Sequence, residues 1–300
     1  APYYPGRYNL MENFAENFTT AKENNEESVF ELQYSSDGDL TWGNESGINL
    51  GSSIPQFIGP VNSGGWAKIM PTSFIVGQFI SEERPAGADT KFDKRMYPSL
   101  FFNPEALGDV VKNESWYGGN YSMEKLWEGN AGKMAGGAPT FSMGDGKFLL
   151  KKYTAYYVND EAADNMGNKE GKANNVRVMR FAEVLLMYAE ALNEIEYSNS
   201  QTSVAMNALN AVHTRSCSSA IQIAELPDKD SFRKAIMLER QREFPYEGHR
   251  WFDLVRMGGA KEAMKAEGHE IQDYQFLYPI PKTELERINN EKLLWQNPGY

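Results

Sequence analysis

Apolar residues recur at helical spacing in the second half of the chain. In residues 177–195 and again in residues 201–213 they lie three or four positions apart, so both segments are predicted to be amphipathic helices. Asn174 or Asn175 precedes the first segment as a candidate N-cap. The two stripes consist of Phe181, Leu185, Tyr188 and Leu192, and of Ala205, Leu209 and Val212. Two such helices joined by a short polar turn are similar to a tetratricopeptide-type hairpin, here over residues 177–213.

A third helix is predicted from Asp228 or Asp230 to about residue 244. Its apolar positions include two glutamates, because Glu239 and Glu243 fall seven and eleven residues after Phe232. Residues 249–258 predict another helix that ends near a pair of glycines. Three charged residues line one side of it, Arg250, Asp253 and Arg256. Near the C-terminal end of the chain, a short helix is predicted with a capping box made by Thr283 and Glu286.

The first half has a different pattern. Residues 8–24 carry one apolar helical stripe, and residues 28–35 alternate as a strand does. From there to about residue 175 the chain is rich in Gly, Asn, Ser and Pro, which predicts short elements between loops. Long loop regions in globular proteins are usually functional. We therefore predict a mainly α fold with long irregular loops and a few short strands, with ligand binding in residues 1–175 and a helical scaffold in residues 176–300.

Charge and composition exclude several classes of function. With 41 acidic and 30 basic residues the net charge is −11, which argues against binding of nucleic acid or of anionic membrane surfaces. A single cysteine excludes an intramolecular disulfide and a cysteine-cluster metal site, and there are 3 histidines. The chain contains no apolar run of the roughly 18–20 residues that span a bilayer.

The segment ERQREFPYEGHRWFDLVRMG, residues 239–258, has the densest charge in the chain and could be an active site or a structural ion network. Its acids and bases are nearly balanced, lie at helical spacing and are embedded among large apolar residues, which favours interhelical salt bridges. The predicted network consists of Glu239, Arg242, Glu243, Arg250 and Asp253. The nucleophile-elbow, P-loop, zincin and dinucleotide-binding motifs are absent from the sequence, so we predict that the protein is not an enzyme.

Three long blocks occur in a characteristic order: RFAEVLLMYAEALNE, the charged segment above, and YPIPKTELERINNEKLLWQNPGY. Together with FELQYS and FDKRMYP they resemble the SusD/RagB family of surface glycan-binding lipoproteins of Bacteroidetes. The resemblance implies one SusD/RagB-like domain over residues 1–300 that lacks the family's N-terminal half. It also implies an outer-membrane, surface-exposed protein, lipid-anchored through a cysteine upstream of this chain and docked on a SusC-like TonB-dependent transporter. Where the family more often has arginine, this chain has His213.

Candidate ligand contacts follow from the chemistry of sugars, whose apolar faces stack on aromatic rings and whose hydroxyls bind amides and charged groups. Aromatic residues beside glycine and small amides occur in LTWGNES, NSGGWAK and ESWYGGNYS. The candidates are Trp42, Trp66, Trp116 and Tyr117, whereas Trp251 and Trp295 are expected in a core. A peptide or protein ligand is the alternative. No cofactor is predicted, and whether calcium binds at SSDGDLT, residues 35–41, stays open.

A final expectation concerns exposed apolar surface. The N-terminal helices of a complete family member would cover part of the stripes in residues 8–24 and 177–213. Without those helices, some Leu, Phe or Tyr side chains of the two stripes are expected to be exposed.

Overall fold

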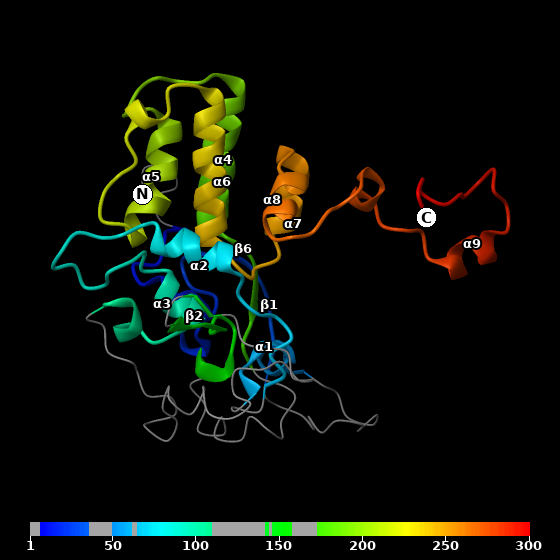
Figure 1. Cartoon of the computed structure of the whole chain (residues 1–300), viewed down its shortest axis with the longest axis horizontal. Coiled ribbons are helices and arrows are strands. Elements are labelled where there is room, and N and C mark those ends of the chain that lie inside the picture. Colours follow the sequence, from blue (N-terminus) through cyan, green and yellow to red (C-terminus); the bar gives the residue numbers. More distant parts are fainter. Residues whose placement is uncertain (1–6, 36–49, 62–64, 110–141, 144–145, 158–172) are drawn as a thin grey trace. The chain divides into compact units, whose positions relative to one another are not determined.

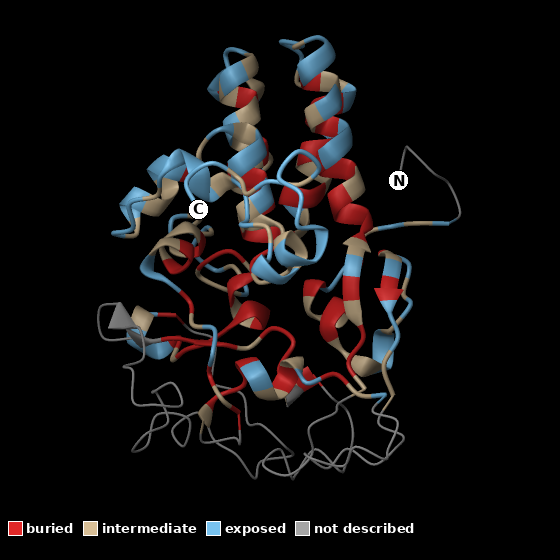
Figure 2. Cartoon of the chain, turned by 90° about the vertical axis from the view of Figure 1, so that its right-hand side faces the viewer, coloured by how far each residue is buried: buried red, intermediate tan, exposed pale blue. Residues whose placement is uncertain are grey.

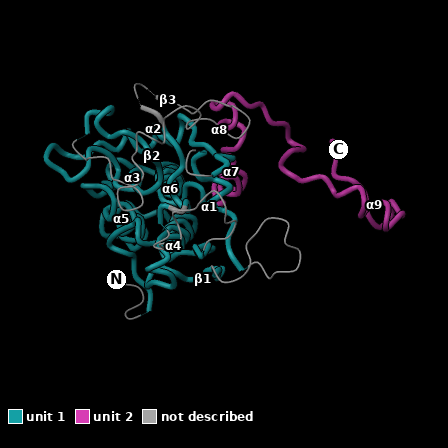
Figure 3. The backbone as a smooth tube through the Cα atoms, turned by 90° about the horizontal axis from the view of Figure 1, so that it is seen from below, with its two compact units in different colours: residues 1–247 teal, residues 248–300 magenta. Residues whose placement is uncertain are grey.

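The computed structural model describes residues 7–35, 50–61, 65–109, 142–143, 146–157 and 173–300. The chain forms two compact units, residues 1–247 and residues 248–300, shown in teal and magenta in Figure 3. The described residues are mainly helical with a few short strands, as predicted. The proposed division at residue 175 concerns ligand binding and stays a prediction. None of the helices in the described ranges is long and apolar enough to cross a lipid bilayer.

Three helices of the first unit lie side by side, α4 (Phe181–Ile195), α5 (Val204–Ser216) and α6 (Lys229–Glu243) (Figure 1). The predicted hairpin of α4 and α5 is therefore present. Ser203 caps α5 by accepting a hydrogen bond from Met206 N at 3.2 Å, and Asp228 caps α6 by accepting one from Ser231 N at 2.8 Å. Their facing sides form one buried cluster that includes Leu186, Leu209 and Ile236.

The first of these helices begins later than predicted. Residues Val176–Arg180 form strand β6, which pairs antiparallel with β1 (Ser28–Leu32), and α4 begins only at Phe181. Asn175 does not cap a helix, because its Oδ1 accepts from Tyr34 N at 2.8 Å and its Nδ2 donates to Glu31 Oε2 at 2.9 Å. The β-branched residues of β6 suit a strand, and the edge of β1 supplies the partner that a local pattern cannot reveal.

The predicted helix over residues 8–24 is also wrong. This segment forms two short 3₁₀ helices, Phe14–Phe18 and Thr20–Lys22. Asn13 accepts from Ala15 N at 3.1 Å, and Asn25 Nδ2 donates to Lys22 O at 2.9 Å. Asn and Thr side chains that bond to nearby backbone compete with helix formation, so the apolar spacing alone was not enough.

The described part of the loop-rich half contains short elements, as predicted. They are α1 (Ile54–Ile58), α2 (Ser73–Ile80), α3 (Met96–Ser99), β2 (Leu100–Phe101), β3 (Ser142–Met143), β4 (Gly146–Lys147) and β5 (Leu149–Leu150). β2 pairs with β5, and β3 pairs with β4. Two further buried clusters lie here, one around Val76, Phe79 and Phe148 and one around Phe18 and Tyr153. Aromatic packing thus replaces long elements as the source of a core.

The second unit contains α7 (Arg250–Met257), α8 (Ala260–Ala266), a 3₁₀ turn at Asp273–Phe276 and α9 (Lys282–Ile288). Gly258 follows α7 with φ of 80°, so the predicted end of this helix is confirmed. Pro281 occupies the N-cap position of α9 without a side-chain cap, so the capping box at Thr283 is wrong. Trp251 is half-buried and stacks on Phe276 with ring centroids 6.2 Å apart, whereas Trp295 is exposed, so neither tryptophan is fully buried in a core.

Burial along the predicted stripes is uneven. Phe14 and Phe18 are buried, as are Leu185 and Leu209, because the chain covers them itself. Figure 2 shows buried positions in red and exposed positions in pale blue along the helices. Tyr188 on α4 remains 42% exposed, in line with the expectation that part of the stripe would be uncovered.

Candidate functional site

Trp66 lies on a short irregular segment that is hydrogen-bonded to α1. Trp66 N donates to Gln56 O at 2.8 Å, and Lys68 N donates to Phe57 O at 3.0 Å. Gly65 makes this approach possible, since a Cβ atom there would lie 2.1 Å from the carbonyl oxygen of Gly59. Gly65 of NSGGWAK therefore serves a close backbone contact, which fixes the backbone position of the neighbouring Trp66.

Apolar side chains are exposed on both of these hydrogen-bonded segments. Phe57 on α1 is 42% exposed, and Ile69, three residues after Trp66, is 41% exposed. The Trp66 side chain itself is half-buried. The hydrogen bonds fix the backbone at Trp66, and exposed apolar side chains lie on the same two segments, so the indole is a candidate for stacking on the apolar face of a ligand. We call Phe57, Trp66 and Ile69 the Trp66 patch.

The other predicted ligand contacts cannot be placed. Trp42, Trp116 and Tyr117 lie outside the described residues, as do residues 36–41 of the candidate calcium segment. Each of these stays a prediction.

The predicted ion network divides into separate parts, the largest of which contains Glu239 and Glu243. Arg95 Nη1 lies 2.5 Å from Glu239 Oε1 and 3.1 Å from Glu243 Oε2. Arg180 Nη1 lies 2.7 Å from Glu243 Oε1 and 2.5 Å from Glu27 Oε1. These charges join α6 to β6, to the segment before β1 and to the start of α3. Further members are Asp93, Lys152, Arg215 and Glu247.

The remaining predicted members lie elsewhere. Arg242 turns toward the end of α2, where its Nη1 lies 2.8 Å from Glu82 Oε2. Arg250 and Asp253 belong to the second unit, in which Asp253 Oδ1 accepts from Arg256 Nη2 at 2.8 Å. Burial lowers the pKa of the Arg250 guanidinium, an effect that the Asp253 carboxylate opposes.

Close pairing controls the protonation of the buried network. Burial alone would raise the pKa of the Glu239 carboxyl, but the Arg95 charge and a hydrogen bond with His213 lower it to about 2. Burial lowers the pKa of the Lys152 ammonium to about 8, against the opposing effect of Glu247. Against the effect of burial, neighbouring arginines likewise lower the pKa of the Glu243 and Glu247 carboxyls, so Glu239, Glu243 and Glu247 are held ionised by their cations and do not fit the role of a general acid.

Sequence reasoning missed most of the network's cations. A usable signal was present for two of them, because Arg95 and Arg180 stand next to large apolar residues. Arg95 follows Phe92 and precedes Met96 within FDKRMYP, and Arg180 precedes Phe181. A charge at such a position requires a buried partner. The cations are Arg95, Lys152, Arg180 and Arg215.

One group of candidate metal ligands occurs among the described residues. Glu82, His213 and Cys217 place a carboxylate oxygen, an imidazole nitrogen and a sulfur within 4.8 Å of one another.

Comparison with known proteins gives a consistent result. The model of the SusD family matches residues 26–300. SusD-like protein P2 of Formosa agariphila is 35% identical over 152 residues, which is 48% of this chain and 29% of that protein. A SusD superfamily protein from Bacteroides vulgatus superposes with a TM-score of 0.68 at 22% identity, covering 100% of this chain and 56% of the other.

A further similar structure is surface glycan-binding protein A from Bacteroides thetaiotaomicron in complex with laminarihexaose. Its TM-score is 0.66 at 23% identity, and the match covers 99% of this chain and 57% of that protein. At this identity the likeness shows a common fold. The chain spans a little over half the length of the two solved structures.

Proposed function

Because the chain belongs to the SusD family, we propose that it is part of a non-catalytic cell-surface protein that captures oligo- or polysaccharide. The observation that carries this proposal is the family match over residues 26–300, which includes Trp66 and its surroundings. The similarity to a surface glycan-binding protein solved with laminarihexaose supports a glycan as the ligand class. The pairing of the buried carboxylates supports the absence of catalysis.

The proposal includes a location and a partner. The protein would be held at the outer membrane, facing outward, by a lipid anchor upstream of this chain. It would pass its glycan to a SusC-like TonB-dependent transporter. These points rest on the family resemblance, and co-purification of the transporter with the lipid-anchored protein tests them.

The Trp66 patch is the proposed contact among the described residues. Flat indole and phenyl rings offer large apolar area at little cost in conformational entropy, so they suit the C–H face of a pyranose. Trp42, Trp116 and Tyr117 are proposed as further contacts.

The test begins with a glycan array probed with the chain, followed by calorimetric titration with the oligosaccharide that binds best. Trp66→Ala should weaken binding about tenfold, equivalent to about 1.4 kcal/mol. Trp295→Ala is the control, since Trp295 is an exposed tryptophan of the second unit. Unchanged affinity in Trp66→Ala would remove the Trp66 patch from the site. Failure to bind any glycan, with binding to a peptide library, would favour a peptide ligand.

The proposal that the protein does not cleave its ligand has a separate test. A panel of oligosaccharides incubated with the protein should keep its chain lengths. Reproducible cleavage that disappears when one carboxylate is replaced would contradict the proposal.

A further inference from the structure

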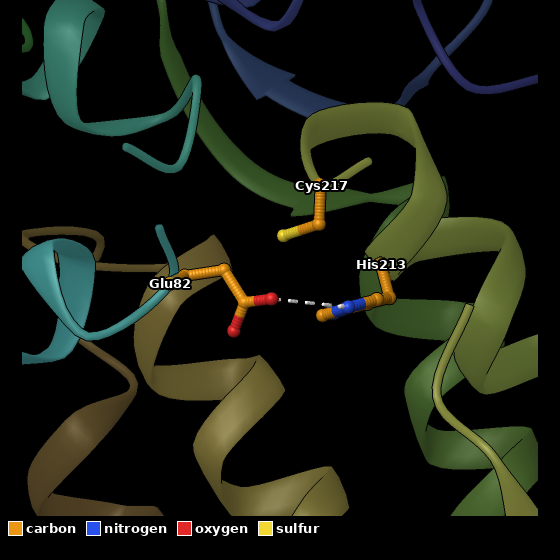
Figure 4. Close-up of side chains that lie close together, drawn as sticks. All are labelled: Glu82, His213 and Cys217. Carbon is orange, nitrogen blue, oxygen red and sulfur yellow. Dashed lines mark ion pairs between the residues drawn. The ribbon is translucent and has the colours of Figure 1, made fainter. Parts of the chain in front are cut away.

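The last turn of α5 and the residue two positions after α2 bring three different donor groups together (Figure 4). His213 lies within α5, and Cys217 follows four residues later at its C-cap. His213 Nε2 is 3.8 Å from Glu82 Oε1. His213 and Cys217 are buried, whereas the Glu82 side chain keeps 26% exposure, which leaves an entry path for a small ion.

The imidazole is oriented by a second carboxylate. His213 Nδ1 lies 2.8 Å from Glu239 Oε2, and Glu239 is itself held by Arg95 through its other oxygen. A neutral imidazole in this geometry donates its Nδ1–H to Glu239, so the lone pair of Nε2 points toward Glu82. Metal-binding histidines commonly have this arrangement, in which a carboxylate fixes the tautomer and increases the basicity of the ligating nitrogen.

We propose that Glu82, His213 and Cys217 form a binding site for a thiophilic divalent cation of the Zn²⁺ type, with Glu239 as the orienting residue. Nitrogen, sulfur and carboxylate oxygen in tetrahedral array are the ligands that Zn²⁺ prefers. Bonds of about 2.0–2.3 Å place tetrahedral ligand atoms roughly 3.3–3.8 Å apart. The three donor atoms lie within 4.8 Å of one another, so the longest separation must shorten by about 1 Å to reach this range. The partly exposed Glu82 side chain can move by that amount. Water would complete the fourth position.

The charges around the three ligands permit a cation. Asp93 Oδ2 lies 3.5 Å from Cys217 Sγ, and Glu239 adds a second negative charge behind the imidazole. Two arginines repel a cation at this place. Arg95 Nη2 lies 3.8 Å from Cys217 Sγ, and Arg242 forms an ion pair with Glu82. While the thiol is protonated, three carboxylates face two arginines. The net charge around the site is therefore −1, from Asp93, Glu239 and Glu82 against Arg95 and Arg242.

Binding must release the thiol proton. Burial raises the pKa of the Cys217 thiol, and the neighbouring carboxylates act in the same direction. The metal–sulfur bond offsets the cost of deprotonating the thiol. Because protons compete with the metal for the sulfur, the affinity for the metal should fall as pH decreases.

The chain's single cysteine makes the test specific. Titration of the 300-residue protein with Co²⁺ should produce a thiolate-to-cobalt charge-transfer absorption that saturates at about one ion per chain and is displaced by Zn²⁺. Cys217→Ser should abolish this absorption, and His213→Gln should weaken binding at least about tenfold. His269→Gln is the matched control, because His269 is an exposed histidine of the second unit and should leave the titration unchanged.

Circular dichroism on each variant separates loss of binding from loss of folding. If His213→Gln does not fold, Glu82→Gln replaces it, since that carboxylate is partly exposed and the substitution keeps its shape. The proposal is overturned if the wild-type protein develops no charge-transfer absorption, or if Cys217→Ser or the folded ligand variant retains it at unchanged affinity. Neither outcome bears on glycan binding, which the Trp66 variant tests separately.

Discussion

Glu239 occupies the apolar side of α6 together with Phe232 and Ile236, and its charge is tolerated there because Arg95 and His213 surround it. A buried ion pair gains little over an apolar pair of the same volume, but removal of one partner leaves an unpaired charge. Such pairs specify which segments meet, since Arg95 is 144 positions away in the sequence. The network therefore selects one packing arrangement of the first unit.

Replacement of Glu239 should destabilise the protein strongly. Glu239→Ala removes one of the carboxylates that neutralise the buried Arg95 charge. We expect the free energy of unfolding to fall by about 3–5 kcal/mol. Urea unfolding measures the change. Glu194→Ala is the control: it removes a surface pair with Lys229 and Arg233 and should change stability by under about 1 kcal/mol. A variant that keeps its stability but loses glycan binding would show that Glu239 belongs to a binding site.

Acid should destabilise the protein through the same residue. The pKa of Glu239 is about 2 in the folded protein and near 4.5 in the unfolded chain, so below about pH 4.5 the unfolded state takes up the proton first. Stability should be complete above about pH 4.5 and fall toward about pH 2, with about 3 kcal/mol attributable to this group. Urea unfolding across this range should give a shallower pH dependence in Glu239→Gln than in the wild-type protein. Equal pH dependence of stability in the two proteins would contradict the lowered pKa assigned to Glu239.

Among the elements, α5 begins with a side-chain cap. Ser203 Oγ accepts from Met206 N, one of the N–H groups that the first turn of a helix leaves without an intrahelical partner. Ser203→Ala should lower the free energy of unfolding by about 1 kcal/mol, measured by thermal or urea denaturation. Ser203→Asn retains a capping oxygen and should stay close to the wild-type value. Equal losses in both variants would point to a role other than capping.

On the scale of the whole molecule, the buried clusters and the ion network lie within the first unit among the described residues. A chain that ends at His249 should therefore unfold cooperatively, as followed by circular dichroism on heating. Ending at His249 keeps the new terminal carboxylate away from Glu247. A chain that ends at residue 227 lacks α6 and should not fold, because it loses Phe232 and Ile236 together with the network residues Glu239, Glu243 and Glu247. Loss of cooperative unfolding in the longer fragment would show that residues 250–300 are needed for the first unit.

Local sequence determined α5, α6 and α7, together with the shortness of the elements in the described part of the loop-rich half. Each of these helices combines apolar spacing with a stop or start signal in its own residues, such as Asp228 or Gly258. The same information identified Glu239 and Glu243 as charges on an apolar face. Long amphipathic segments with caps are specified by interactions within a few residues, so their sequences are sufficient to predict them.

Tertiary structure decided the rest, because the partners are distant in sequence. β6 is a strand because β1, about 150 residues earlier, satisfies its backbone, and only the fold decided which carboxylates the cations of the network meet. The same holds for Glu82, which the fold brings to His213 and Cys217. A residue pattern records what its own helix or strand requires, whereas a buried charge or a metal ligand is defined by groups that only folding brings within a few ångströms.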